Sequence, residues 1–267
     1  MISRFINLSL VIPVMGDIER YRLHDLLDEY ATLKSHEAGE DEKATLLLAD
    51  WLVNLFENNY TLRVESIPLI KPEFDNLEKT IQWTIKEENG GLLATLATKP
   101  RNWLMNYFRE LDKWQAWLIY SLDINFDDIQ LKANVLQAIG DVQQFRKETD
   151  AAIESYNEAL KLFRQVGAKL GEANVYLSLG GAKRESKDFA GARIDFENAL
   201  KVYQRIGDQY SQARALYRLG DCLSDEEKYK DALAQYEKAS QLWTAIGVTD
   251  LVESILKPRI EEAKKHF

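Results

Sequence analysis

Cysteine is almost missing from this chain of 267 residues, in which Cys222 is the only one. A single cysteine cannot form an intramolecular disulfide, which favours a reducing compartment, and we expect the chain to be cytoplasmic. Histidine is nearly as rare, since the only three, His24, His36 and His266, lie far apart in sequence. These ligands are too few for a zinc site, and we expect neither a metal nor another cofactor.

Proline, glycine and long apolar runs are also scarce. With 5 prolines and 13 glycines, the composition favours long helices over a turn-rich β fold. The chain has no run of about 18 apolar residues, so we expect no transmembrane helix and no membrane partner. Basic residues are outnumbered by acidic ones, 34 against 43, and the resulting net charge of -9 repels phosphate backbones. Direct binding of nucleic acid is therefore not expected.

A repeat of 40 residues fills the C-terminal half. Three segments beginning at Ala133, Ala173 and Ala213 align without a gap, and their apolar residues are spaced by three and four, as in helices. Each segment is predicted to be a pair of antiparallel helices. In the first segment the two helices lie at about 131–145 and 149–165. Aromatic side chains are expected to fill the space that small residues leave between the helices. The recurring columns are Gly140/Gly180/Gly220, Ala152/Ala192/Ala232, Tyr156/Phe196/Tyr236, Ala159/Ala199/Ala239, Phe163/Tyr203/Trp243 and the helix-ending Gly167/Gly207/Gly247.

The spacing of Gly140, Ala152, Tyr156 and Ala159 resembles that of the tetratricopeptide repeat, and so does the spacing in the next two segments. The resemblance implies an all-α fold, a right-handed α-solenoid of helix pairs. The family's usual period is about 34 residues, so we expect the extra residues to lengthen the second helix and the link to the next repeat. The amphipathic segment 249–267 is predicted to cap the stack, with Pro258 kinking or restarting its helix.

The N-terminal half shows no clean repeat. The run LSLVIPV at 8–14, a turn centred on Gly16-Asp17 and the returning ERYRL predict a small β-hairpin. Helices are predicted at 24–34, at 42–59 and at 74–87, the last capped by Asp75, and two or three more over 92–124, interrupted near Pro100. Six tryptophans at helical spacing are expected in the core rather than around a ligand: Trp51, Trp83, Trp103, Trp114, Trp117 and Trp243.

The segment RYRLHDLLDEYA resembles the end of the winged-helix domain in signal-transduction ATPases of the NB-ARC/STAND class, and DNLEKTIQW resembles the start of the helices that follow it. This resemblance implies four parts: a winged-helix end (1–36), a connecting helical region that ends in a degenerate repeat (37–128), three repeats (129–248) and a capping helix (249–267). In that class the histidine matching His24 contacts a nucleotide phosphate. The alternative for His24 is that it begins a helix beside its own hairpin and contacts no nucleotide.

Function is assigned to the first helix of each repeat, whose variable positions face the inner groove. We expect a protein-interaction module and not an enzyme, a sensing arm of a STAND-type regulator that binds a peptide or protein segment. A DNA-linked regulator fragment and an accessory scaffold subunit are the alternatives. The candidate ligand-binding residues are Asn134, Gln137, Asp141, Asn174, Arg184, Arg214, Tyr217, Arg218 and Asp221. The alternative is that these residues line a solvated groove that binds no ligand. Arginine beside asparagine favours an acidic ligand.

This chain alone is predicted neither to bind ATP tightly nor to hydrolyse it. The sequence contains no GxxxxGK[ST] loop, whose backbone amides cradle phosphate in P-loop ATPases. Calorimetric titration with ADP and with ATP plus magnesium should show no micromolar binding. A micromolar dissociation constant that is lost in His24→Ala would contradict this prediction and restore a nucleotide role for His24.

Overall fold

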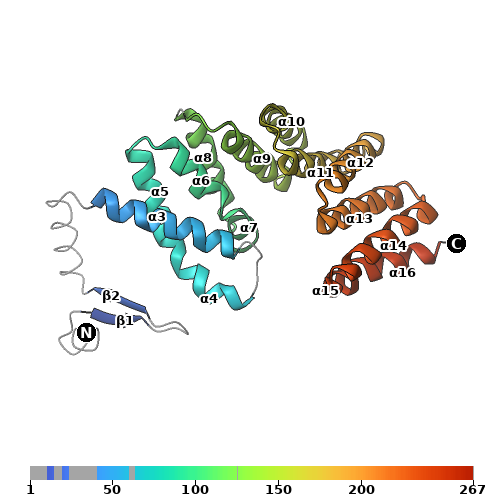
Figure 1. The fold of residues 1–267 in the computed structure, drawn as a ribbon, viewed down its shortest axis with the longest axis horizontal. Coiled ribbons are helices and arrows are strands. Elements are labelled where there is room, and N and C mark those ends of the chain that lie inside the picture. Colours follow the sequence, from blue (N-terminus) through green and yellow to red (C-terminus); the bar gives the residue numbers. More distant parts are fainter. Residues whose placement is uncertain (1–10, 15–19, 24–40, 60–63, 125, 267) are drawn as a thin grey trace. The chain divides into compact units, whose positions relative to one another are not determined.

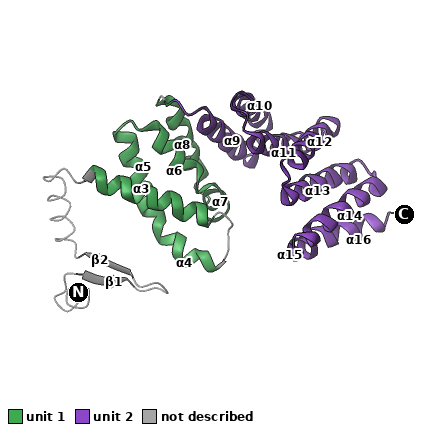
Figure 2. Cartoon of the chain, viewed as in Figure 1, with its two compact units in different colours: residues 1–126 green, residues 127–267 purple. Residues whose placement is uncertain are grey.

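The computed structural model describes residues 11–14, 20–23, 41–59, 64–124 and 126–266 (Figure 1). Apart from two short strands, these residues are helical. The strands β1 (Val11–Val14) and β2 (Arg20–Leu23) pair antiparallel, with Val11 opposite Leu23. The turn expected between the strands, His24 and the helix predicted at 24–34 lie outside the described residues, so the winged-helix end stays a prediction. The chain divides into two compact units, residues 1–126 and 127–267 (Figure 2).

The first unit packs several helices around buried leucine, isoleucine and tryptophan side chains. The helices predicted at 42–59 and 74–87 are confirmed, and so is the helical stretch interrupted at Pro100. The elements are α3 (Asp41–Asn58), η1 (Val64–Ser66), α4 (Ile67–Ile70), η2 (Lys71–Glu73), α5 (Phe74–Lys86), α6 (Gly90–Thr98), α7 (Arg101–Trp103), the π-helix η3 (Leu104–Phe108) and α8 (Leu111–Asp123).

Two details of this unit correct the sequence analysis. Asp75 does not cap α5, because η2 leads directly into that helix and the amide of Phe74 already donates to the carbonyl of Lys71. Trp51 is not a core residue, since it is 44% exposed on α3. By contrast, Trp103 and Trp114 are fully buried, and their indole N–H groups donate to backbone carbonyls at 2.7 Å.

The second unit stacks three helix pairs and a terminal segment. The predicted pairs are confirmed to within a few residues at their ends. Their first and second helices, called A and B below, are α9 (Ile129–Phe145) and α10 (Thr149–Val166), α11 (Lys169–Glu185) and α12 (Phe189–Ile206), and α13 (Gln209–Asp225) and α14 (Tyr229–Ala245). The extra residues of the 40-residue period do not lengthen the links as expected, because only residues 167–168 separate α10 from α11. Helices of 17 and 18 residues absorb them.

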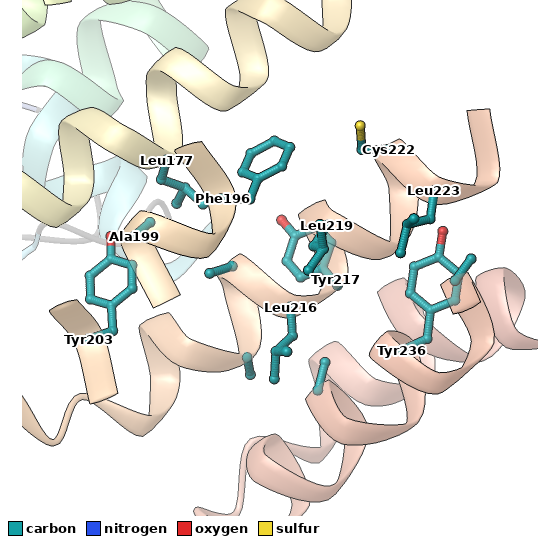
Figure 3. Close-up of a cluster of buried hydrophobic side chains, with 14 of the residues drawn as sticks. Leu177, Phe196, Ala199, Tyr203, Leu216, Tyr217, Leu219, Cys222, Leu223 and Tyr236 are labelled. Carbon is teal, nitrogen blue, oxygen red and sulfur yellow. The ribbon is translucent and has the colours of Figure 1, made fainter. Parts of the chain in front are cut away.

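Within each pair the aromatic ring of helix B lies against the glycine of helix A. A Cβ atom placed on Gly140 would stand 2.5 Å from the ring of Tyr156, and one on Gly180 would stand 2.6 Å from the ring of Phe196. Gly220 and Tyr236 repeat the contact at 2.6 Å. Figure 3 shows Phe196 and Tyr236 within the buried cluster that joins the second and third pairs. Only glycine allows the two helices to approach this closely.

Each helix B ends in the same hydrogen-bonded turn. Gly167 takes a φ of 72°, donates to the carbonyl of Arg164, and lets the amide of Ala168 donate to Phe163 at 2.9 Å. Gly207 and Gly247 do the same one and two repeats later, so the predicted helix stops are confirmed. A left-handed residue at this position satisfies the last carbonyls of a helix, and glycine adopts it without strain. The turn also sets where the next helix A begins.

The terminal segment covers the last helix pair, as expected of a cap. It consists of α15 (Thr249–Leu251), the π-helix η4 (Val252–Leu256) and α16 (Lys257–Lys264). Leu256 and Ala263 are buried in the same cluster as Tyr236 and Trp243. Pro258 lies in the first turn of α16, directly after the π-helix, so an α-helix begins again at the predicted place. Among the described residues, none of the helices combines the length and the apolar character needed to cross a bilayer.

The glycine contact predicts different stabilities for two adjacent substitutions. Gly180→Ala should lower the free energy of unfolding by about 1–3 kcal/mol, because the new methyl group overlaps the ring of Phe196. Gly181→Ala is the control, since its Cβ would meet only the side-chain amide of Gln144, at 3.3 Å. Urea unfolding followed by circular dichroism measures both. Equal stabilities for the two variants would contradict the packing described here.

Candidate functional site

Three of the predicted groove residues meet in one pocket between helices α9 and α11. The pocket has a volume of about 310 Å³ and is lined by residues of the first two repeats. Asn134, Gln137 and Asn174 all line it, so the structure brings these three candidate residues together. The complete lining is Gln130, Asn134, Gln137, Phe163, Ala168, Lys169, Leu170, Gly171 and Asn174.

The turn between α10 and α11 builds one side of this pocket. Phe163 comes from the last turns of α10 and is 1% exposed. A Cβ on Gly171 would stand 2.5 Å from its ring, so glycine at this position lets the start of α11 lie directly on the aromatic side chain. Gly171 belongs to no repeat column, and its role was not apparent from the sequence. The result is an apolar wall opposite the amide side chains.

A buried tyrosine holds the amide group of Asn174. The hydroxyl of Tyr203, in α12, donates to the Asn174 Oδ1 at 2.7 Å. Burial raises the pKa of Tyr203 to about 12, so the hydroxyl remains a neutral donor throughout the physiological range. Because Oδ1 is already an acceptor, the Nδ2 group of Asn174 remains as the donor end of the amide. The pocket therefore contains an oriented amide that can donate to a carbonyl.

One ion-pair group lies beside the pocket. Lys169 donates to the Glu172 Oε2 at 2.8 Å, and the Arg164 Nε donates to Oε1 at 3.2 Å. Burial opposes ionisation of Glu172, but the hydrogen bonds from Lys169 and Arg164 outweigh it and hold the pKa below its ordinary value. The carboxylate is therefore charged at neutral pH. It holds Lys169 at the pocket wall and neutralises part of its charge.

Other predicted groove residues form a second, charged cluster that ties helices together. Arg184 of α11 reaches across to α13, where its Nε donates to Asp225 at 2.5 Å and its guanidinium lies 3.7 Å from Asp221. Arg259 of α16 donates to the Asp221 Oδ1 at 2.7 Å. These contacts link α11, α13 and α16 on the face that was expected to bind ligand. The charge of Arg184, which suggested recognition of an acidic ligand, is balanced inside the protein.

The two aspartates that follow the glycine column bind the tyrosines of helix B. The Tyr156 hydroxyl donates to Asp141, at 2.9 Å, and the Tyr236 hydroxyl donates to Asp221, at 3.0 Å. Both carboxylates are less than 10% exposed. In the middle repeat both partners are replaced together, since Phe196 has no hydroxyl and Gly181 has no carboxylate. Sequence analysis treated Asp141 and Asp221 as groove residues and missed this pairing, which the joint replacement could have revealed.

The remaining candidates lie outside the pocket lining. Tyr217 is 7% exposed, and the guanidinium groups of Arg218 and Arg259 lie over its ring at 5.1 and 5.6 Å. Arg218 is exposed and Arg214 is half-buried. Cys222 is fully buried, as expected of a core residue, and burial raises the pKa of its thiol to about 11. Its thiol is therefore protonated at neutral pH.

The repeats match known sequence families. Tetratricopeptide-repeat models match residues 133–165 and residues 171–245, so the second unit carries tetratricopeptide repeats. These residues are most of the first helix pair and nearly all of the next two. No curated protein matches the chain in sequence.

Solved structures share the fold at low sequence identity. The apo form of RapI is 17% identical, with a TM-score of 0.61 over 90% of this chain and 70% of its own. A Rap protein complexed with competence and sporulation factor is 15% identical, with a TM-score of 0.54 over 66% of this chain and 52% of its own. A STAND ATPase with a tetratricopeptide repeat sensor, from Pyrococcus horikoshii, is 17% identical, with a TM-score of 0.56 over 74% of this chain. This chain spans 30% of that ATPase.

The tyrosine–aspartate contact is expected to be energetically coupled. Asp141→Ala should destabilise the protein by about 1–3 kcal/mol, because the buried Tyr156 hydroxyl loses a partner. In the Asp141→Ala variant, Tyr156→Phe should lower the free energy of unfolding by less than it does in the wild type. The middle repeat already combines phenylalanine with the absence of a carboxylate. A double-mutant cycle from urea unfolding measures this, with an expected coupling of about 1 kcal/mol. Strictly additive effects would show that the pair is not an interacting unit.

Proposed function

We propose that this chain is a protein-binding module that holds an extended peptide segment in the pocket between α9 and α11. We further propose that it serves as the sensing arm of a STAND-type regulator. The observation that carries the first proposal is the set of side-chain amides gathered in one pocket: Gln130, Asn134, Gln137 and Asn174. The proposal for the regulator rests on the fold and on the segments that resemble that class.

The chemistry of the pocket suits a peptide backbone. Each side-chain amide offers both donors and an acceptor, the same groups that an extended backbone presents in return. The Tyr203 hydroxyl fixes one amide in advance, which lowers the cost of ordering it when ligand binds. Leu170 and the half-buried Ala168, packed over the buried Phe163, offer apolar surface for a ligand side chain. The pocket lining includes no carboxylate, and Lys169 adds one cation, so an acidic side chain on the ligand is tolerated there.

Similar structures support both parts of the proposal. The Rap protein with this fold was solved in complex with competence and sporulation factor, so the fold can bind another molecule. The similar ATPase carries its repeats as a sensor. A sensing role is consistent with the sequence, in which a segment resembling a winged-helix end precedes the repeats.

Binding is tested with a peptide selected against the chain itself. Phage-displayed random peptides are panned on the purified protein, and the affinity of the best one is measured by fluorescence anisotropy. Asn174→Asp is the decisive variant, since it keeps an oxygen acceptor for Tyr203 and removes the Nδ2 donors. Together with Asn134→Ala it should weaken binding by about tenfold or more, because two hydrogen bonds to the peptide are lost.

Asn198→Ala is the matched control, because Asn198 is a half-buried asparagine of α12 outside the pocket lining. It should change the affinity less than about twofold. Equal losses in the control and in the pocket variant would place the binding site elsewhere. Urea unfolding of every variant separates a loss of binding from a loss of folding.

A further inference from the structure

A second surface runs along the edge of the repeat stack where each helix B turns into the next helix A. Three β-branched residues, Val166, Ile206 and Ile246, stand directly before the helix-ending glycines and are 41%, 41% and 37% exposed. Leu170 and Tyr210, at the starts of α11 and α13, are 52% and 43% exposed. All five recur at intervals of 40 residues, so the stacking of the repeats places them at the same edge. We call this set the apolar edge.

The helix-ending turn does not account for these exposed side chains. Its usual hydrophobic contact joins the residue after the glycine to a residue four positions before the glycine. In the first repeat these are Ala168 and Phe163, whose backbone groups are bonded at 2.9 Å. Val166 and its counterparts take no part in that contact. Large apolar side chains that recur in a partly exposed position are typical of interaction surfaces.

Positive charge accompanies the apolar edge in the first two repeats, although the chain as a whole is acidic; the corresponding residues of the third repeat, 241–250, include no basic residue. Residues 161–170 and 201–210 contain five basic residues and one acidic residue, Asp208, against 34 basic and 43 acidic residues in the whole chain. Asp208 accepts the amide of Ser211 at the start of α13. Lys161, Lys201 and Arg205 are exposed and take part in no ion pair among the described residues. Lys161 precedes Val166 by five residues on α10, and on α12 Lys201 and Arg205 precede Ile206 by five residues and by one residue.

We infer that the apolar edge and its three cations form a docking surface for an acidic segment of another protein that carries apolar side chains on one face. The charge selects the partner, since carboxylates are attracted to the cations of the edge and lysines are repelled. The apolar columns span three repeats, so a helix or extended strand of the partner can contact several of them at once. Leu170 is the one edge residue that also lines the pocket between α9 and α11, and the other edge residues and the three cations lie outside its lining.

The probe is a synthetic amphipathic peptide of about 20 residues, with leucine on one face and glutamate on the other. A twin peptide carries lysine in place of every glutamate. Fluorescence anisotropy with the full chain should show binding of the acidic peptide that weakens as salt rises, and much weaker binding of the basic twin. Ile206→Ser and Lys201→Glu should each raise the dissociation constant by about tenfold.

Two matched controls keep the test specific. Ile194→Ser changes an isoleucine that is 59% exposed on α12 away from the edge, and Lys230→Glu reverses an exposed lysine at the start of α14. Both should leave the affinity within about twofold. Asn174→Asp should also leave it unchanged, which separates this surface from the pocket.

Four results would overturn the inference. The first is failure of the acidic peptide to bind, and the second is equal binding of the basic twin. The third is an edge variant that behaves like the two controls. If sedimentation shows that the wild type self-associates and that Ile206→Ser abolishes this, the edge joins two copies of the chain and the inference is also wrong. Thermal melting of Lys201→Glu detects a purely structural role for the cation at the end of α12.

Discussion

The close approach of an aromatic ring to a helical glycine governs the architecture of the second unit. With ring carbons about 2.5 Å from where a Cβ would stand, the separation of helices A and B is fixed at Gly140, Gly180 and Gly220. That separation buries the alanine columns completely and leaves each pair with apolar surface that only the next pair, or the cap, can cover. The cap meets this need with Leu256 and Ala263.

The same contact also decides which polar residues appear on the groove face. A tyrosine that lies over the glycine carries its hydroxyl to the far side of helix A, where burial demands a partner. Asp141 and Asp221 supply that partner. Asp221 also accepts a hydrogen bond from Arg259 and lies beside Arg184. Burial and the Asp221 carboxylate both raise the pKa of Tyr236, so its hydroxyl remains a donor. Where phenylalanine replaces tyrosine, Gly181 leaves room for the side chain of Gln144 from the neighbouring helix.

The helix pairs could be predicted because small and aromatic residues recur at a period that only stacked helices explain. The pocket could be predicted in part, since Asn134 and Asn174 occupy equivalent positions on adjacent A helices. The partners of Asp141, Arg184 and Asp221 could not, because each depends on a side chain 15 to 41 residues away whose orientation is set by packing. Asp75 was misjudged for a similar reason, as η2 runs directly into α5 and already satisfies the amide of Phe74, the first residue of that helix. The sequence preferences of a single segment do not reveal which side chains or helices pack against it.

The two proposed surfaces share an origin in the turn from helix B to the next helix A. In the first repeat, residues 163–171 contribute Phe163, Lys169 and Gly171 to the pocket and Val166 and Leu170 to the apolar edge, with Leu170 in both. The turn is only two residues long, so the helices on either side hold these side chains rigidly. Its geometry depends on Gly167 and on the packing of Phe163, which are core features. Substitutions at the exposed positions can therefore change binding without disturbing the stack, whereas the glycines and aromatic residues beneath them cannot vary independently.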